Sequence, residues 1–300
     1  MHATVIINPI AGPGRSRTLD ACAALARTTL GRAGFDVSVC ITTGPEDAQR
    51  FATTAVTAGH ELVVAWGGDG TVNGVGAALA GTKVPLAIIP GGSGNGLARD
   101  LGVPLDASSA FELAGRGTTR LIDAGELDGA LFFNVAGIGL DASIADRMAV
   151  PGARRGLLGY VFATLSELPA YRPRDYAIVF PGGEAAPISS PALFVALANS
   201  RQYGNGAQIA PQALLDDGKL EIVVVRPLSL FGVASRIPAF FNGTLKADDK
   251  VLMRTAAEAE ISSAQDIWFH VDGEPRRGAS NVVLRTRPRI LTVRVKSLLR

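Results

Sequence analysis

The fold is decided by one stretch, Leu62-Val63-Val64-Ala65-Trp66-Gly67-Gly68-Asp69-Gly70-Thr71-Val72-Asn73. Its first five residues are apolar without alternation, which is typical of a parallel strand buried on both faces. The glycines that follow let backbone N–H groups approach phosphate oxygens, and a helix that begins near Thr71 adds partial positive charge. An Asp in such a loop would repel phosphate unless Mg²⁺ lay between them. Asp69 therefore indicates a metal–nucleotide site, and a structural turn with Asp69 as helix cap is the alternative.

A second glycine-rich loop, Pro90-Gly91-Gly92-Ser93-Gly94-Asn95-Gly96, follows the next apolar strand at residues 86–89. Loops at the carboxyl ends of adjacent parallel strands meet at one crevice. The loop nearly fits the G-x-S-x-G nucleophile elbow, but Asn95 takes the place of the last glycine and no catalytic His is evident. A serine hydrolase is therefore not expected. Residues 137–142 fit G-x-G-x-x-A, but a lone match this deep in the chain carries little weight.

Strand and helix signals alternate around these loops. Short β-rich runs occur at residues 4–7, 35–41, 62–66 and 86–89, and helical patterns occur at 16–32, 45–59, 71–79, 97–101 and 108–114. This rhythm predicts a doubly wound α/β nucleotide-binding domain over residues 1–122, with its ligands at the carboxyl ends of the strands.

The pattern changes after residue 120. Short β-rich runs separated by turn residues lie at 120–127, 132–137, 175–180, 193–198, 220–225, 259–262, 267–271 and 282–285. Two helical stretches, 157–168 and 228–241, interrupt them. This pattern predicts an antiparallel β-sandwich domain over residues 123–285.

Composition narrows the classes of function. The chain of 300 residues is 47% hydrophobic and carries a net charge of only +2, without a long basic run, so we expect no nucleic acid partner. The widely separated His2, His60 and His270 predict no zinc site, and Cys22 and Cys40 are expected to be buried thiols in a reducing compartment. Neither a signal peptide nor a transmembrane segment is expected. We therefore expect a cytoplasmic protein.

The motifs resemble the bacterial lipid kinases of the diacylglycerol kinase catalytic-domain superfamily, which also includes sphingosine and ceramide kinases. Residues 67–73 match its G-G-D-G-T-[LIV]-N signature, and Asn8-Pro9-Ile10-Ala11-Gly12 resembles its opening N-P-x-x-G. Thr42 and Ser93 match two positions whose hydroxyls contact nucleotide. The resemblance implies that these residues bind ATP, and that a last strand, within residues 286–300, returns to the first domain.

The resemblance extends into the second domain. Asp123 matches an acidic position near the metal, and Asp217-Gly218-Lys219-Leu220 resembles a structural Mg²⁺ loop. Its implied ligands are the Asp217 carboxylate and the carbonyls of Leu214 and Lys219, which suit a hard cation. Val271-Asp272-Gly273-Glu274 matches the D-G-E motif that carries the family's catalytic base. A hairpin turn is the alternative for Asp272-Gly273.

The resemblance implies a kinase that transfers the γ-phosphoryl group of ATP to a lipid hydroxyl, with Mg²⁺. Asp272 is the expected base and Glu274 the second candidate, both on one strand face; Asp69 would act through Mg²⁺, and Asp123 would support the metal shell. Gly96 stands where the bacterial enzymes usually carry an Asp, so the acceptor stays open between diacylglycerol and a sphingoid-type lipid.

The acceptor is expected at a membrane surface, with peripheral attachment to the inner membrane face as one alternative and a homodimer left open. Two other functions remain as alternatives. An NAD kinase shares the G-G-D-G-T loop, and an inactive member of the fold would bind lipid without turnover.

Overall fold

The computed structural model describes residues 1–11, 18–149 and 170–297. The chain forms two compact units, one of Met1–Ile122 with Arg289–Arg300 and one of Asp123–Pro288. The helix expected at residues 157–168 lies outside the described residues. No helix within the described ranges is long and apolar enough to cross a membrane.

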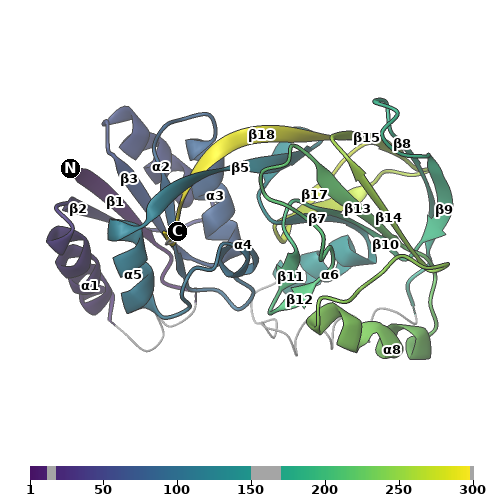
Figure 1. The fold of residues 1–300 in the computed structure, drawn as a ribbon, viewed down its shortest axis with the longest axis horizontal. Coiled ribbons are helices and arrows are strands. Elements are labelled where there is room, and N and C mark those ends of the chain that lie inside the picture. The colour runs from purple at the N-terminus through teal and green to yellow at the C-terminus, as the bar shows by residue number, and fades with distance from the viewer. Residues whose placement is uncertain (12–17, 150–169, 298–300) are drawn as a thin grey trace. The chain divides into compact units, whose positions relative to one another are not determined.

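The first unit is an α/β layer structure (Figure 1). Its parallel strands follow the order β2 (Asp36–Ile41), β1 (His2–Ile7), β3 (Leu62–Gly67) and β4 (Leu86–Pro90). Its helices are α1 (Leu19–Arg32), α2 (Asp47–Thr57), α3 (Asp69–Leu79), α4 (Gly96–Asp100) and α5 (Ala107–Arg116). Helix α1 packs on α5, and α2 packs on α3, so helices cover both faces of the sheet. The predicted doubly wound α/β fold is confirmed.

Local sequence explains these elements. Strand β3 is buried at all six positions, as expected of an apolar parallel strand with helices on both faces. Helix α1 begins after Thr18, whose hydroxyl accepts the N–H of Ala21, and α5 begins after Asp106, whose carboxylate accepts the N–H of Ser109. Next to β4 runs the end of the last strand, where Val293 pairs with Leu86 in parallel.

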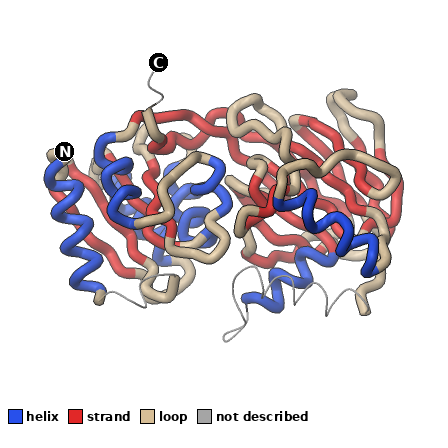
Figure 2. Tube along the Cα trace, turned by 60° about the horizontal axis from the view of Figure 1, so that its bottom comes forward, coloured by secondary structure: helices blue, strands red, loops and turns tan. Residues whose placement is uncertain are grey.

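The second unit is dominated by strands (Figure 2), which pair antiparallel. One sheet has the order β14 (Val251–Ala256), β13 (Leu220–Val225), β10 (Phe194–Ala198), β7 (Val135–Gly139), β16 (Trp268–Val271) and β17 (Glu274–Arg277). The other has the order β18 (Asn281–Val295), β15 (Glu258–Ser262), β8 (Arg174–Val179) and β9 (Ile188–Ala192). Strand β5 (Thr118–Leu127) pairs with β18 and with β6 (Ala130–Phe132), while β11 (Gln202–Gly204) pairs with β12 (Ala207–Gln208).

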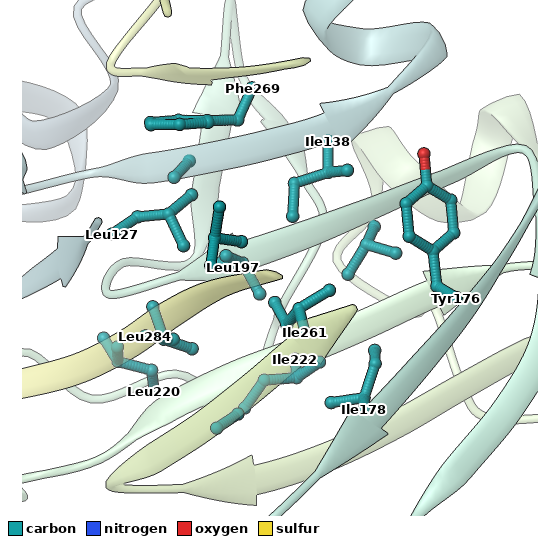
Figure 3. Close-up of a cluster of buried hydrophobic side chains, with 14 of the residues drawn as sticks. Leu127, Ile138, Tyr176, Ile178, Leu197, Leu220, Ile222, Ile261, Phe269 and Leu284 are labelled. Atoms are coloured by element: carbon teal, nitrogen blue, oxygen red, sulfur yellow. The ribbon is translucent and has the colours of Figure 1, made fainter. Parts of the chain in front are cut away.

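The core of the second unit lies between these sheets. Ile138, Leu197 and Ile222 from one sheet and Ile178 and Ile261 from the other belong to one buried cluster (Figure 3). The predicted antiparallel sandwich is therefore confirmed. Helix α8 (Leu230–Phe241) lies within the expected stretch 228–241.

The helix α6 (Leu140–Ala149) was not predicted from the sequence. It begins directly after β7, without a polar linker that would mark a boundary. Gly139 makes this change of direction possible, because its φ of +87° lies in the left-handed region that favours glycine.

Candidate functional site

The first glycine loop leads directly from β3 into helix α3. Gly68 is the N-cap of α3 and, within the described residues, no side chain caps this end. The first N–H groups of a helix have no partner within the helix, and they carry partial positive charge. The start of α3 is therefore suited to an anionic group such as phosphate.

The Asp69 carboxylate connects the first glycine loop to the second. Its Oδ2 accepts the N–H of Asn95 at 3.0 Å and its Oδ1 accepts the N–H of Gly96 at 2.9 Å. The two loops thus meet, as the strand order predicts. Gly96 contributes a backbone N–H to this contact.

The two loops approach so closely that only glycine fits at the contact. A Cβ added to Gly92 would lie 2.7 Å from the Cα of Gly68, and the N–H of Gly91 donates to the carbonyl of Gly67 at 2.8 Å. Asn95 adopts the left-handed conformation, and its side chain makes hydrogen bonds to both the N–H and the carbonyl of Gly92. The loops therefore form one backbone cradle at the start of α3, and the first N–H groups of that helix suit an anion such as phosphate.

The Asn8-Pro9 segment lies beside this cradle. Asn8 Nδ2 donates to Thr71 Oγ1 at 3.1 Å, while its Oδ1 accepts the N–H of Ile10 at 3.0 Å. Thr42 follows β2 and is buried, with its N–H donating to the carbonyl of Ile7 at 2.9 Å. Ser93 is exposed on the second loop. Gly12 lies outside the described residues.

In the second unit, Asp123 lies directly under the loop expected to bind a metal. Its carboxylate is fully buried and its Oδ2 accepts the N–H of Gly218 at 2.6 Å. The N–H of Asp123 donates to the carbonyl of Leu215 at 2.7 Å. These two hydrogen bonds connect Asp123 to the loop at residues 214–219.

This loop fits a hard cation by its donor chemistry. Asp217 Oδ1 accepts the N–H of Lys219 at 3.0 Å, and Gly218 has the positive φ of a tight turn. Among the described residues, no group of three or more His, Cys, Asp or Glu side chains could hold a metal ion. A cation here would thus depend on one carboxylate with the carbonyls of Leu214 and Lys219, all of them oxygen donors.

The D-G-E segment forms a two-residue hairpin turn between β16 and β17. Asp272 and Gly273 both have positive φ, 48° and 90°, and Val271 pairs with Glu274. The expectation that Asp272 and Glu274 share a strand face is therefore wrong, because Asp272 lies in the turn and not in a strand. Glu274 is exposed.

The Asp272 carboxylate is held in one place by the backbone that leads into β7. Its Oδ2 accepts the N–H of Phe133 at 2.9 Å, and its Oδ1 accepts the N–H groups of Asn134 and Val135, both at 3.0 Å. The catalytic role of Asp272 stays a prediction.

Asn199, which sequence reasoning missed, joins the two acidic positions of the second unit. Its Nδ2 donates to the carbonyls of Asp123 and Phe133, both at 2.9 Å, and no described residue pairs with its buried Oδ1. The Asp217 loop, Asp123, Asn199 and Asp272 thus belong to one hydrogen-bonded network. Its only sequence signal is a polar Asn directly after the apolar run at 193–198.

Comparisons with known proteins place this architecture in a class of kinases. Residues 2–127 match the family model of the diacylglycerol kinase catalytic domain, and residues 134–295 match that of the YegS C-terminal NAD kinase beta sandwich-like domain. The chain is 32% identical over 277 residues to a diacylglycerol kinase of Mycobacterium tuberculosis, covering 90% of this chain and 88% of the relative. It is also 32% identical over 249 residues to a "probable lipid kinase YegS-like" of Pseudomonas syringae, covering 82% and 79%. The chain belongs to the diacylglycerol kinase family of lipid kinases.

Solved structures share the fold. A diacylglycerol kinase structure from Bacillus anthracis superposes with a TM-score of 0.75 at 22% identity, covering 100% of this chain and 98% of the other. An NAD kinase from Archaeoglobus fulgidus, solved in complex with ATP, gives a TM-score of 0.54 at 13% identity, covering 99% and 94%. The NAD kinase is thus a distant relative in fold alone.

Proposed function

We propose that the protein is an ATP- and Mg²⁺-dependent lipid kinase, which phosphorylates a hydroxyl of diacylglycerol or of a sphingoid-type lipid. The observation that carries the proposal is the backbone cradle of the two glycine loops at the start of α3. Phosphoryl transfer depends on positioning and on charge neutralisation more than on covalent chemistry, and such a cradle provides the positioning.

The nucleotide would contact residues 8–12, Thr42, residues 67–73 and Ser93. Bound Mg²⁺ would neutralise phosphate charge near Asp69. The hydroxyl oxygen of the lipid forms the new bond to the γ-phosphorus, the bond from that phosphorus to the β,γ-bridging oxygen breaks, and ADP leaves. The hydroxyl proton moves to Asp272, or to Glu274 as the second candidate. Asp123 supports the cation loop of Asp217, Leu214 and Lys219.

An apolar cavity in the second unit supports a lipid acceptor. It has a volume of about 190 Å³, and its lining includes Leu140, Ile144, Phe194, Val233 and Phe240. Hydrocarbon chains gain free energy by leaving water for such a lining. The cavity thus suits the apolar part of a lipid better than it suits a dinucleotide.

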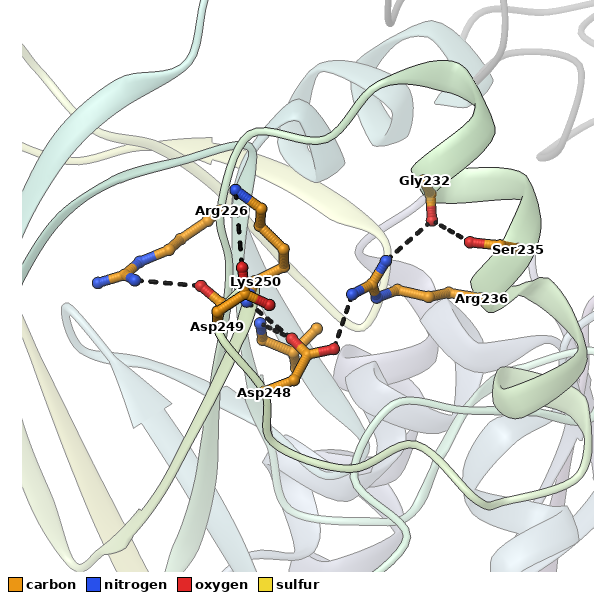
Figure 4. A network of polar contacts seen from close by, with 8 residues as sticks. Arg226, Gly232, Ser235, Arg236, Asp248, Asp249 and Lys250 are labelled. Carbon is orange, nitrogen blue, oxygen red and sulfur yellow. Dashed lines mark hydrogen bonds and ion pairs between the residues drawn. The ribbon is translucent and has the colours of Figure 1, made fainter.

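Arg236 of α8 lines this cavity, and its ion pair with Asp248 ties the helix to the segment before β14 (Figure 4). Arg236 donates from Nη2 to Asp248 Oδ2 at 2.7 Å and from Nη1 to the carbonyl of Gly232 at 3.2 Å. Near its start, α8 exposes Leu230 and Phe231, the latter at 83%. Exposed apolar side chains on a helix favour contact with a membrane surface. A cytoplasmic protein that attaches to the inner membrane face would use them to reach its acceptor.

The test is to incubate the protein with γ-labelled ATP, Mg²⁺ and one acceptor at a time from a panel of diacylglycerol, monoacylglycerol, sphingosine, ceramide and NAD. We expect label in one lipid and none in NAD. Label in NAD alone would establish an NAD kinase. Lipid binding without label in any acceptor would establish the inactive lipid-binding alternative.

A further inference from the structure

A buried Asp–His pair lies behind the D-G-E turn. Asp141 is in the first turn of α6 and His270 is in β16, and their exposed fractions are 2% and 7%. His270 Nε2 lies 2.7 Å from Asp141 Oδ2. The two residues are 129 positions apart in the sequence, and the proposed reaction uses neither of them.

The second nitrogen of the same ring contacts the turn itself. The N–H of Gly273 donates to His270 Nδ1 at 3.3 Å. A nitrogen that accepts this bond carries no proton, so the ring proton lies on Nε2 and donates to Asp141. Burial lowers the pKa of His270, but the carboxylates of Asp141 and Asp272 raise it, and the net direction is upward. The neutral ring with its proton on Nε2 is thus the form on the alkaline side of the titration.

This pair also explains the G-x-G-x-x-A match at residues 137–142. A Cβ at Gly137 would overlap both Asp141 Oδ2 and His270 Nε2, so only glycine leaves room for the pair. Gly139 turns the chain so that α6 starts at Leu140 and Asp141 falls in its first turn. The two glycines therefore have a structural explanation that does not involve a dinucleotide.

We propose that Asp141 and His270 are positioning residues, which set the backbone of the Asp272-Gly273 turn and thereby the place of the Asp272 carboxylate. The inference rests on the proposed function, in which Asp272 is the base. Asp272 is held from two sides: Phe133, Asn134 and Val135 bind its carboxylate, and the Asp141–His270 pair binds the next peptide of the turn. Neither member of the pair touches a reacting atom.

Three variants test separately the two hydrogen bonds of the His270 ring, one with Asp141 and one with Gly273. His270→Gln keeps an N–H that can reach Asp141 but offers Gly273 no acceptor. His270→Asn places an oxygen near the Nδ1 position but is too short to reach Asp141. Asp141→Asn keeps an oxygen that can accept from Nε2. The matched control is His2→Gln, because the His2 side chain is 63% exposed.

The first measurement uses the unmodified protein and needs no activity. Nitrogen-15 NMR of the imidazole, on the alkaline side of its titration, should show His270 with its proton on Nε2 and with Nδ1 unprotonated. The His270→Gln variant identifies the signal. A proton on Nδ1 of the neutral ring would overturn the proposal.

The second measurement separates positioning from general stability. In folded His270→Gln we expect shifted amide signals for Phe133, Asn134 and Val135, about a tenfold lower kcat and an unchanged KM for ATP. The kcat of Asp141→Asn should fall less than that of His270→Gln. Unchanged amide signals with an unchanged kcat would overturn the proposal. If the unmodified protein phosphorylates no lipid, the proposed function fails, whereas the NMR signals still decide whether the pair sets the turn.

Discussion

The glycine loops of the first unit and the acidic positions of the second unit are built in different ways. In the first unit, Asp69 joins two short segments, residues 67–73 and 90–96, each of which is contiguous in the sequence. In the second unit, Asp123, Asn199, Gly218 and Asp272 come from four distant segments and are joined through backbone N–H and carbonyl groups. A site built from contiguous glycine loops can be predicted from its sequence, whereas a site assembled from distant segments needs the fold.

Within the first unit, the largest effect is expected at Asp69, where the two glycine loops are joined. Asp69→Asn removes the charge and turns one acceptor oxygen into a donor that would face the N–H of Asn95 or Gly96. We expect turnover to fall by at least ~10²-fold, the scale of lost electrostatic stabilisation at a charged transition state. Initial rates with saturating ATP provide the measurement. Asp36→Asn, with an 82% exposed side chain in the same unit, should behave as the unmodified protein. Near-normal turnover in a folded Asp69 variant would refute the role.

A smaller effect is expected when the loops are forced apart. Gly92→Ala places a methyl group 2.7 Å from the Cα of Gly68, where backbone rather than a flexible side chain must move. We expect ATP to bind roughly tenfold more weakly, because misplaced groups reduce binding and catalysis together. Calorimetric titration with ATP measures this. In α1, Gly31→Ala meets no atom within 4 Å and serves as the control. Equal affinity in both variants would show that the close approach is not needed.

The cation loop should give a moderate effect. Asp217→Ala removes the one side-chain ligand, so both the melting temperature and the activity should fall, and added Mg²⁺ should no longer raise the melting temperature. Thermal unfolding with and without Mg²⁺ tests this. Asp249→Ala, with an 80% exposed side chain in the same unit, is the control. A variant that still responds fully to Mg²⁺ would place the cation elsewhere.

The smallest effect is expected at the surface of α8. Phe231→Ser should weaken sedimentation with vesicles that contain anionic lipid and raise KM for a vesicle-bound acceptor, by a few fold for one lost apolar contact. Its melting temperature should not change, because the side chain is exposed. Leu105→Ser, also at an exposed apolar residue, is the control. Equal sedimentation of both variants would argue against membrane contact through α8.

Much of the fold followed from the sequence because hydrophobic patterns are local. Runs such as 62–66 and 220–225 correspond closely to β3 and β13. Two of the missed elements lacked such a pattern. Strand β17 reads Glu-Pro-Arg-Arg and owes its pairing to the turn before it, while α6 follows β7 without a polar boundary.

The candidate site could be predicted from the sequence only in part. The glycine loops were expected from their own residues, but Asp123, Asp217 and Asp272 came from family resemblance. The hydrogen bonds of Asp272 could not be predicted from the sequence, because the three donor residues lie 137 to 139 positions away in the chain. Asp128-Gly129 shows why the D-G pair alone is a poor guide. It forms the same kind of turn, with φ of 49° and 81°, between β5 and β6.

In the proposed reaction, the loops of the first unit bind the nucleotide and the Asp272 carboxylate accepts the proton of the lipid hydroxyl. The most direct test measures ATP binding and lipid phosphorylation side by side in Asp272→Asn, with Asp128→Asn as the matched control on the other D-G turn. We predict that Asp272→Asn binds ATP like the unmodified protein and phosphorylates no lipid, while Asp128→Asn does both normally. Normal lipid phosphorylation by a folded Asp272→Asn would contradict the role of Asp272 as the base. Its role would then be limited to the structure of the hairpin turn.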